Sequence, residues 1–291
     1  MLVTADERFV RITEVGPRDG LQNESEIVPS TDKIALVDAL SEAGFPEIET
    51  TSFVSPRWVP QLADATEVLQ GVRRRPGTRY SALVPNARGL ERAVEAGADK
   101  FAVFTAASEA FCRRNLNATI AESIERFEPI FRAAAERSLP VRGYVSCVVA
   151  CPYEGRIDPS SVRETVERLI AAAGPSIEIA LGETLGVADP DDLEAVVDEV
   201  SIVVAPGLID LHLHDTNGRA REGVARALER GVRAFDSSCA GLGGCPYAPG
   251  ASGNLATEAL LEMLHREGWR TGIDLGQVSR AAAFARRITG R

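Results

Sequence analysis

Short β-rich segments alternate with amphipathic helical segments along the whole 291-residue chain. This alternation predicts an α/β fold, and eight β/α units are the number found in a (β/α)8 TIM barrel. The composition is even along the chain, and no linker rich in Gly, Ser or Pro divides it. We therefore predict one domain over residues 1–291, a single TIM barrel with a glycine-rich loop after the eighth strand and a C-terminal helix.

The eight predicted strands are short apolar runs rich in β-branched residues. In chain order they are residues 10–15, 47–52, 79–84, 100–105, 141–148, 176–181, 208–214 and 234–237. The predicted helices have apolar residues at helical spacing, and many start at a capping residue or end at a glycine. They are residues 30–43, 61–72, 87–96, 120–138, 159–173, 190–201, 219–230, 254–266 and 275–288.

The main alternative to a barrel is an open, doubly wound sheet. Such a sheet would carry a glycine-rich phosphate-binding turn after its first strand. That position holds the segment GPRDG at residues 16–20, which lacks the glycine spacing of such a turn. The barrel therefore remains the predicted fold.

Charge and cysteine content exclude several classes of protein. The net charge is −10 and no block rich in Lys and Arg occurs, so we expect no nucleic-acid partner. No run approaches the ~18 apolar residues of a membrane span, and the first residues lack the pattern of a signal peptide. The five cysteines are too few and too scattered for a disulfide framework. We expect a reduced, cytoplasmic protein, with Cys147 and Cys151 as buried free thiols rather than a redox pair.

Two of the three histidines, His212 and His214, close the seventh predicted strand. Side chains two apart in a strand point to the same face, so both imidazoles leave one end of the strand together. This arrangement suits two ligands of a metal ion. A pair that is only hydrogen-bonded to a carboxylate such as Asp215 is the structural alternative.

In a TIM barrel, reactive residues collect at the C-terminal ends of the strands. Strand one is followed by Asp19, strand seven ends in the two histidines, and the loop after strand eight carries Asn254. Strands one, seven and eight become neighbours when the barrel closes. We therefore expect Asp19, His212, His214 and Asn254 to converge on one ion.

The ligand set predicted here contains nitrogen and oxygen atoms but no thiolate. Such a set favours Mg²⁺ or Mn²⁺ with open positions for substrate, although it tolerates Zn²⁺ or Co²⁺. Metal-dependent hydrolases with the barrel fold need further histidines on later strands. Only His265 remains, in a predicted helix, so a hydrolase of that kind is not expected.

Other residues near strand ends are candidates for catalysis or substrate binding. Long loops in compact domains are usually functional, so Cys245 in the glycine-rich loop could act as an acid, a base or a reactive thiol. Arg18 and Glu49 could form a salt bridge that also orients the guanidinium group. For Tyr144 and Glu183, spacing alone favours a structural role.

Several long motifs resemble the hydroxymethylglutaryl-CoA lyase family, over residues 10–275. They are VGPRDGLQNE at 15–24, IETTSFVSP at 48–56, RGYVSC at 142–147, GLGGCPYA at 241–248 and NLAT at 254–257. Two positions depart from the family pattern. Glu183 stands where an Asp is expected and Asn217 where a Tyr is expected, and both leave the substrate's alkyl group open.

The resemblance implies roles for individual residues. It assigns the metal ligands to Asp19, His212, His214 and Asn254, and the catalytic arginine to Arg18. It assigns a catalytic loop cysteine to Cys245 and a supporting acid to Glu49. His212 and Asp19 are the candidate general bases. The substrate contacts we expect are Arg18, Ser52, Tyr144 and Glu183.

The resemblance also implies the reaction: cleavage of 3-hydroxy-3-methylglutaryl-CoA to acetyl-CoA and acetoacetate, a step of leucine degradation and ketone-body formation. It implies a divalent metal, no organic cofactor, an acyl-CoA substrate as the partner, and a homodimer or larger homo-oligomer. The alternatives are a lyase for a longer 3-hydroxy-3-alkylglutaryl-CoA, a condensing enzyme of the isopropylmalate or citramalate type, and a metal- or CoA-binding protein without turnover. Arg18 and Cys245 are both present, which argues against the last.

Overall fold

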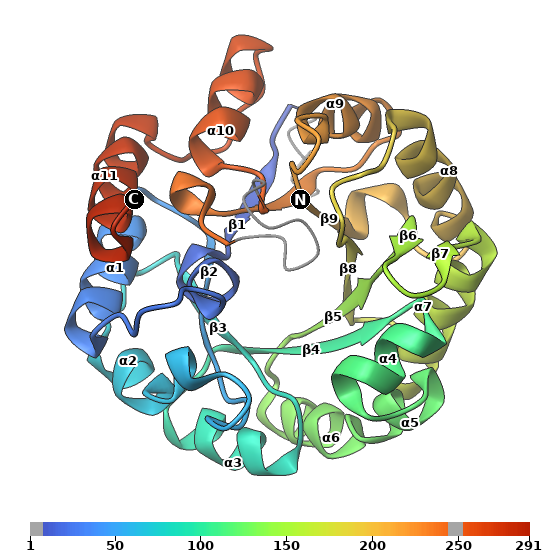
Figure 1. Ribbon diagram of the computed structural model, residues 1–291, viewed down its shortest axis with the longest axis horizontal. Coiled ribbons are helices and arrows are strands. Elements are labelled where there is room, and N and C mark those ends of the chain that lie inside the picture. Colours follow the sequence, from blue (N-terminus) through green and yellow to red (C-terminus); the bar gives the residue numbers. More distant parts are fainter. Residues whose placement is uncertain (1–7, 244–252) are drawn as a thin grey trace, which may run out of the picture.

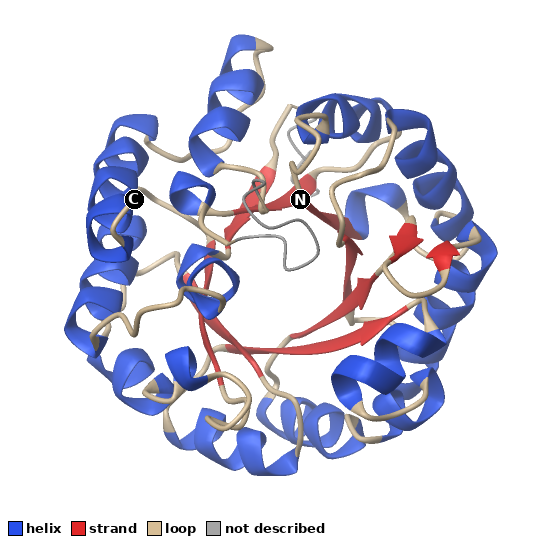
Figure 2. Ribbon diagram, viewed as in Figure 1, coloured by secondary structure: helices blue, strands red, loops and turns tan. Residues whose placement is uncertain are grey.

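The computed structural model describes residues 8–243 and 253–291, and it forms a closed barrel of eight parallel strands (Figures 1 and 2). The strand order around the barrel brings β1 between β10 and β2. The predicted fold is therefore confirmed, including the closure that makes the first, seventh and eighth predicted strands neighbours. In chain order the barrel strands are β1 (Arg11–Glu14), β2 (Glu47–Ser52), β3 (Arg79–Leu83), β4 (Lys100–Ala106), β5 (Val141–Ser146), β8 (Glu178–Glu183), β9 (Ile209–Leu213) and β10 (Ala234–Ser237).

Helices surround the barrel as an outer ring (Figure 2). Their starts and ends follow local sequence signals: the Asp158 side chain accepts a hydrogen bond from Ser160 N at the start of α7, and Gly44 beyond α1 has φ +89°. The helices are α1 (Ser30–Glu42), α2 (Ala65–Gly71), α3 (Ala87–Glu95), α4 (Glu109–Leu116), α5 (Ile120–Glu125), α6 (Glu128–Arg137), α7 (Pro159–Ala173), α8 (Pro190–Val200), α9 (Ala220–Glu229), α10 (Thr257–Arg266) and α11 (Leu275–Thr289).

Four main features differ from the prediction. The helix expected over 120–138 is two helices, because Pro129 has no N–H to donate and its ring clashes with the carbonyl group of Glu125, where α5 ends. Helix α4, capped by Ser108, and the short hairpin of β6 (Ala150–Cys151) and β7 (Gly155–Arg156) were not predicted. Helix α10 starts after Asn254, because Asn254 forms a bridge with His214 instead.

The apolar core lies mainly between the strands and the ring of helices, whereas charged side chains fill much of the barrel interior. Near the N-terminal ends of the strands, the ammonium group of buried Lys100 binds Glu47, with Nζ to Oε2 2.8 Å, and also binds Glu178. Cys147 and Cys151 are buried and free, as predicted. Within residues 8–243 and 253–291, no helix combines the length and apolar character that a membrane crossing requires.

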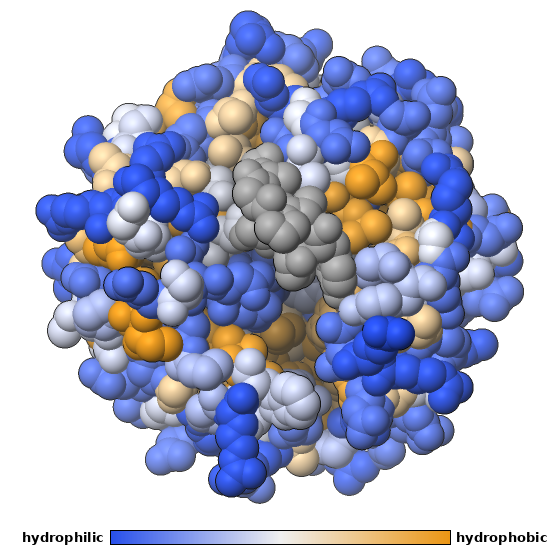
Figure 3. Space-filling view, in the orientation of Figure 1, coloured by the Kyte–Doolittle hydropathy of each residue, from blue (hydrophilic) through white to orange (hydrophobic). Residues whose placement is uncertain are grey.

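The face at the C-terminal ends of the strands is hollowed near its centre. Figure 3 shows that apolar side chains line part of this hollow and that hydrophilic side chains surround it. The turn that follows β1 and the segments that follow β9 and β10 all reach this end of the barrel (Figure 1). Residues from segments far apart in the sequence therefore meet here.

Candidate metal centre and active site

Asp19, His212 and His214 meet at the C-terminal end of the barrel. One ligand atom from each lies within 4.8 Å of the others. Asp19 lies in a π-helical turn, Gly16–Gly20, directly after β1, whereas His212 is on β9 and His214 follows its last residue. The predicted convergence of these three side chains is confirmed, and together they could hold a metal ion.

Asn254 lies beside this cluster. Its amide nitrogen Nδ2 donates to Asp19 Oδ2 at 2.8 Å and to the carbonyl oxygen of Leu242 at 3.1 Å. Among the residues that the structure describes, Asn254 Oδ1 and His214 Nδ1 are buried without a hydrogen-bond partner. Buried polar atoms are normally paired. A carboxylate, two imidazoles and an unpaired amide oxygen are ligands that fit a divalent cation.

The protonation of Asp19 and His214 also suits a cation. Burial opposes ionisation of Asp19, but the adjacent Arg18 charge and His212 lower the pKa of Asp19 to about 2. Burial and the neighbouring His212 lower the pKa of His214 to about 4. Metal ligands must be deprotonated, so a carboxylate and a neutral imidazole are both available at neutral pH.

A carboxylate behind His212 holds its ring. His212 Nδ1 lies 3.2 Å from Asp236 Oδ2, and His212 Nε2 lies 3.9 Å from Asp19 Oδ2. Burial alone would lower the pKa of His212, but the hydrogen bond to Asp236 and the charge of Asp19 raise it above its ordinary value. A metal-binding histidine commonly has such a carboxylate on its other nitrogen. Asp236 was not predicted, although an acidic residue within the predicted strand 234–237 was an available signal.

Arg18 is held between two carboxylates next to the cluster. Its guanidinium group binds Asp19 on one side, and its Nη2 donates to Glu49 Oε2 at 2.8 Å on the other. Glu49 Oε2 also accepts a hydrogen bond from the Tyr144 hydroxyl group at 3.0 Å. The expected pairing of Arg18 with Glu49 is confirmed, and the guanidinium group has a fixed orientation beside Asp19.

The other predicted site residues lie as follows. Ser52 is buried at the end of β2, and its hydroxyl group accepts from Val54 N at 3.2 Å. The Glu183 carboxylate accepts backbone N–H groups of its own loop, with Val187 N at 3.4 Å, and burial raises the pKa of Glu183 to about 7. Substrate contacts of these two residues stay predictions. Cys245 lies outside the described residues, so its role stays a prediction as well.

One buried acidic residue, Glu14, ties together segments around the candidate site, and it was not predicted. It accepts from Gly16 N at 2.7 Å, from Cys239 N at 2.8 Å and from the Thr257 hydroxyl group at 2.7 Å. These donors belong to the turn that carries Asp19, to the segment after β10 and to the start of α10. An acidic residue within a predicted barrel strand was the available signal.

The turn after β1 requires small residues at both of its ends. A Cβ atom on Gly16 would lie 2.6 Å from Glu14 Oε1, and one on Gly20 would lie 2.7 Å from Leu242 Cβ. The turn that carries Arg18 and Asp19 is therefore packed directly against the segment after β10.

Comparisons with known proteins agree with this geometry. The HMGL-like family matches residues 9–285. The mitochondrial hydroxymethylglutaryl-CoA lyase of Bos taurus is 52% identical over 279 residues, which cover 94% of this chain and 84% of that protein. The cytoplasmic 3-hydroxy-3-methylglutaryl-CoA lyase of Danio rerio is 50% identical over 276 residues, 95% of this chain and 82% of that protein.

Solved structures extend the likeness to three dimensions. The HMG-CoA lyase of Brucella melitensis has a TM-score of 0.95 at 49% identity, and the match covers 97% of this chain and 99% of that one. An HMG-CoA lyase of Acinetobacter baumannii, in complex with coenzyme A and 3-methylmalate, has a TM-score of 0.92 at 37% identity, with coverage of 99% and 93%. We conclude that this chain belongs to the HMGL-like family, which includes these lyases.

Proposed function

We propose that this chain is a carbon–carbon lyase that cleaves 3-hydroxy-3-methylglutaryl-CoA to acetyl-CoA and acetoacetate. Relatives about half identical over most of their length carry this activity in their names. The observation that carries the proposal is the placement of Arg18: its guanidinium group is held by Glu49 and Asp19, directly beside the His212 and His214 pair.

We assign the ion site to Asp19, His212, His214 and Asn254, with Mg²⁺ or Mn²⁺ as the ion. The unpaired Asn254 Oδ1 supports its place as the fourth ligand. A divalent ion at this site supplies a positive charge that makes a neighbouring hydroxyl group more acidic. His212 and Asp19 are the two candidate acceptors for the proton of the substrate's tertiary hydroxyl group.

Loss of that proton lets the alkoxide become the ketone of acetoacetate, and the bond to the carbon next to the thioester breaks. The electron pair of this bond passes into the enolate of the thioester. Arg18 stabilises the negative charge, because its orientation is fixed before the charge develops. Cys245 then supplies the proton that converts the enolate to acetyl-CoA.

The remaining features follow from the same proposal. The substrate is an acyl-CoA, which is supported by coenzyme A bound in the Acinetobacter relative. No organic cofactor takes part, since all steps are proton transfers and one bond cleavage. We also propose a single catalytic domain, a cytoplasmic location, and a homodimer or larger homo-oligomer.

An assay of the purified protein tests this function. The protein is stripped of metal, reloaded with Mg²⁺ or Mn²⁺, and supplied with 3-hydroxy-3-methylglutaryl-CoA, and acetoacetate is measured by an NADH-coupled dehydrogenase. Wild type should form acetoacetate, and Arg18→Gln should have a kcat about 10²–10³ lower with a much smaller change in KM. If wild type forms no product, or Arg18→Gln is as fast as wild type, the proposal is wrong.

The same assay with longer 3-hydroxy-3-alkylglutaryl-CoA substrates decides the alkyl group. The reason for this comparison is Glu183, whose carboxylate accepts hydrogen bonds from the backbone of residues 185–187. If kcat/KM is higher for a longer substrate, that compound is the preferred substrate in place of the methyl compound, and the proposed type of reaction is unchanged.

A further inference from the structure

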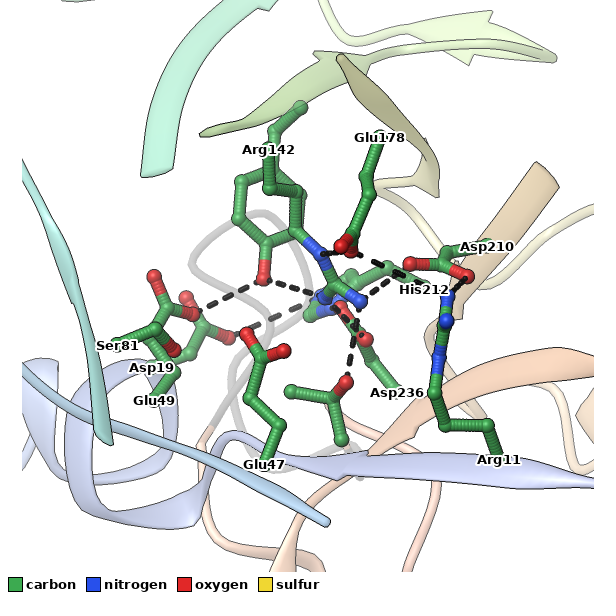
Figure 4. Close-up of polar contacts among 12 residues, drawn as sticks. Arg11, Asp19, Glu47, Glu49, Ser81, Arg142, Glu178, Asp210, His212 and Asp236 are labelled. Atoms are coloured by element: carbon green, nitrogen blue, oxygen red, sulfur yellow. Dashed lines mark hydrogen bonds and ion pairs between the residues drawn. The ribbon is translucent and has the colours of Figure 1, made fainter. Parts of the chain in front are cut away.

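Arg142 lies at the centre of a buried polar network inside the barrel, beneath the proposed ion site (Figure 4). It comes from β5, and its guanidinium group makes four hydrogen bonds to other side chains. Nη1 donates to Asp236 Oδ1 at 2.7 Å and to the Tyr144 hydroxyl group at 3.2 Å. Nη2 donates to the Thr13 hydroxyl group at 3.0 Å and to Asp210. The planar fork of arginine makes such a multiple contact directional.

The first branch of this network leads to the ion site. Asp236 uses one oxygen for Arg142 and the other for His212 Nδ1, at 2.7 and 3.2 Å. The carboxylate therefore cannot rotate without losing one of these bonds. The register of the parallel strands supports this contact between the two side chains, because Asp236 on β10 is paired with His212 on β9. Arg142 thus fixes, through Asp236, the orientation in which His212 presents Nε2 to the site.

The second branch leads to the catalytic arginine. A guanidinium group only donates hydrogen bonds, so the Tyr144 oxygen must accept from Arg142. The single hydroxyl proton of Tyr144 is then free to go to Glu49 Oε2, 3.0 Å away. Glu49 in turn holds Arg18. The carbon at the centre of each guanidinium group lies close to the Tyr144 ring centroid, at 5.5 Å for Arg142 and 5.6 Å for Arg18.

We propose that Arg142 is a positioning residue that sets both halves of the site, through Asp236 to His212 and through Tyr144 and Glu49 to Arg18. The inference rests on the proposed function where it concerns the reaction. It also predicts properties of the protein without substrate, namely the affinity for the ion and the state of the His212 ring.

Lys100 provides a matched control. It is also a buried cation inside the barrel and also binds two carboxylates, Glu47 and Glu178, toward the N-terminal ends of the strands. Glu178 Oε2 also lies 3.9 Å from Arg142 Nε, but the hydrogen bonds of Lys100 go to Glu47 and Glu178 and not to Asp236 or Tyr144. If Arg142 only neutralised buried carboxylates, then replacing either cation would have similar consequences. If Arg142 positions the site, only its replacement should change ion binding.

The central test compares wild type, Arg142→Lys and Lys100→Gln. Arg142→Lys retains the positive charge between the carboxylates but loses the planar fork. Titration of metal-free protein with Mn²⁺ should show a dissociation constant about 10–100-fold higher for Arg142→Lys, the range for losing an outer partner of a metal ligand. Lys100→Gln should remain within about twofold of wild type. An unchanged constant in Arg142→Lys, or an equal rise in both variants, overturns the proposal.

The histidine ring spectrum gives a second readout without substrate. The chain has only three histidines, so their ring signals can be assigned by NMR in metal-free protein. Wild type and Lys100→Gln should show a protected proton on His212 Nδ1, and Arg142→Lys should lose this protection. If Arg142→Lys does not fold, the same two measurements are made on Asp236→Asn. This variant removes the carboxylate between Arg142 and His212 but keeps Arg142 paired with Asp210.

The two branches can be separated by further variants. Asp236→Asn should weaken Mn²⁺ binding, and adding Arg142→Lys to it should cause little further loss, because both act through one contact. Tyr144→Phe should lower kcat and leave the Mn²⁺ constant within about twofold. A strong effect of Tyr144→Phe on ion binding contradicts the separate branches. If the ion and spectral results hold but no substrate is cleaved, the proposed reaction fails and the positioning role stands.

Discussion

Glu14 should make the stability of this protein depend on pH, because its carboxyl group has no contact with solvent. Burial raises the pKa of Glu14 from 4.5 to about 8, although its three hydrogen-bond donors oppose the rise. The folded protein therefore holds a proton on Glu14 over a pH range in which the unfolded chain has released it. The resulting stability is fully present below about pH 4.5 and is lost as the pH rises through about 8.

The size of the effect follows from this difference in pKa. Each pKa unit corresponds to ~1.4 kcal/mol, so the change from 4.5 to about 8 amounts to about 5 kcal/mol. Glu14→Gln should abolish this dependence, because a glutamine is isosteric with the protonated acid. Its oxygen can accept from Gly16 N and Cys239 N, and its amide can donate to the Thr257 hydroxyl group, which donates to Ser237 Oγ at 2.8 Å.

Urea unfolding of metal-free protein between about pH 5.5 and about pH 8 measures the effect. Over that range the free energy of unfolding of wild type should fall by about 3 kcal/mol relative to Glu14→Gln. Glu122→Gln is the control: a hydrogen bond from the Thr119 backbone lowers the pKa of Glu122, so this residue titrates below the range and its variant should follow wild type. If Glu14→Gln loses stability with pH in parallel with wild type, Glu14 is ionised in the folded protein and the reasoning fails.

Three further predictions concern packing, the loop cysteine and the ion. Gly20→Ala should lower the free energy of unfolding in urea by ~1–3 kcal/mol, because the new Cβ would lie 2.7 Å from Leu242 Cβ. Gly207→Ala is the control: its new Cβ would lie 3.8 Å from the nearest atom, so the free energy of unfolding should not change. Cys245→Ala should fold and bind metal but have a kcat at least ~100-fold lower than wild type. If its kcat equals that of wild type, the thiol takes no part in the reaction. Saturating Mn²⁺ at about 100 times its dissociation constant should stabilise metal-free wild type by ~2.7 kcal/mol, and Asn254→Ala should require a higher Mn²⁺ concentration for the same stabilisation.

Much of the fold could be predicted because each signal is local. β2 and β10 have the predicted bounds, and α7 begins at Pro159 directly after its capping residue. The split between α5 and α6 was missed although Pro129 was visible, because apolar spacing continues across it. The cluster of possible metal ligands followed from two simple rules: alternation of side chains in a strand placed His212 and His214 together, and barrel closure brought Asp19 to them.

The support behind the site could not be predicted, because it depends on register between strands far apart in sequence. Arg142 and Asp236 are separated by 94 residues, and their contact follows from how the strands are staggered around the barrel. An ionisable residue in a buried strand shows that a partner is needed but not which partner it finds. The same holds for Glu14, whose partner Thr257 is 243 residues away.

The central claim is that one divalent ion, held by Asp19, His212, His214 and Asn254, is required for cleavage of 3-hydroxy-3-methylglutaryl-CoA. Titration of metal-free protein with Mn²⁺, with bound ion and acetoacetate formation measured in the same samples, tests it most directly. The account predicts no turnover without the ion, a rate that rises in proportion to bound Mn²⁺, and saturation at about one ion per chain. Full turnover in metal-free protein, or a rate that does not follow the bound ion, would contradict it.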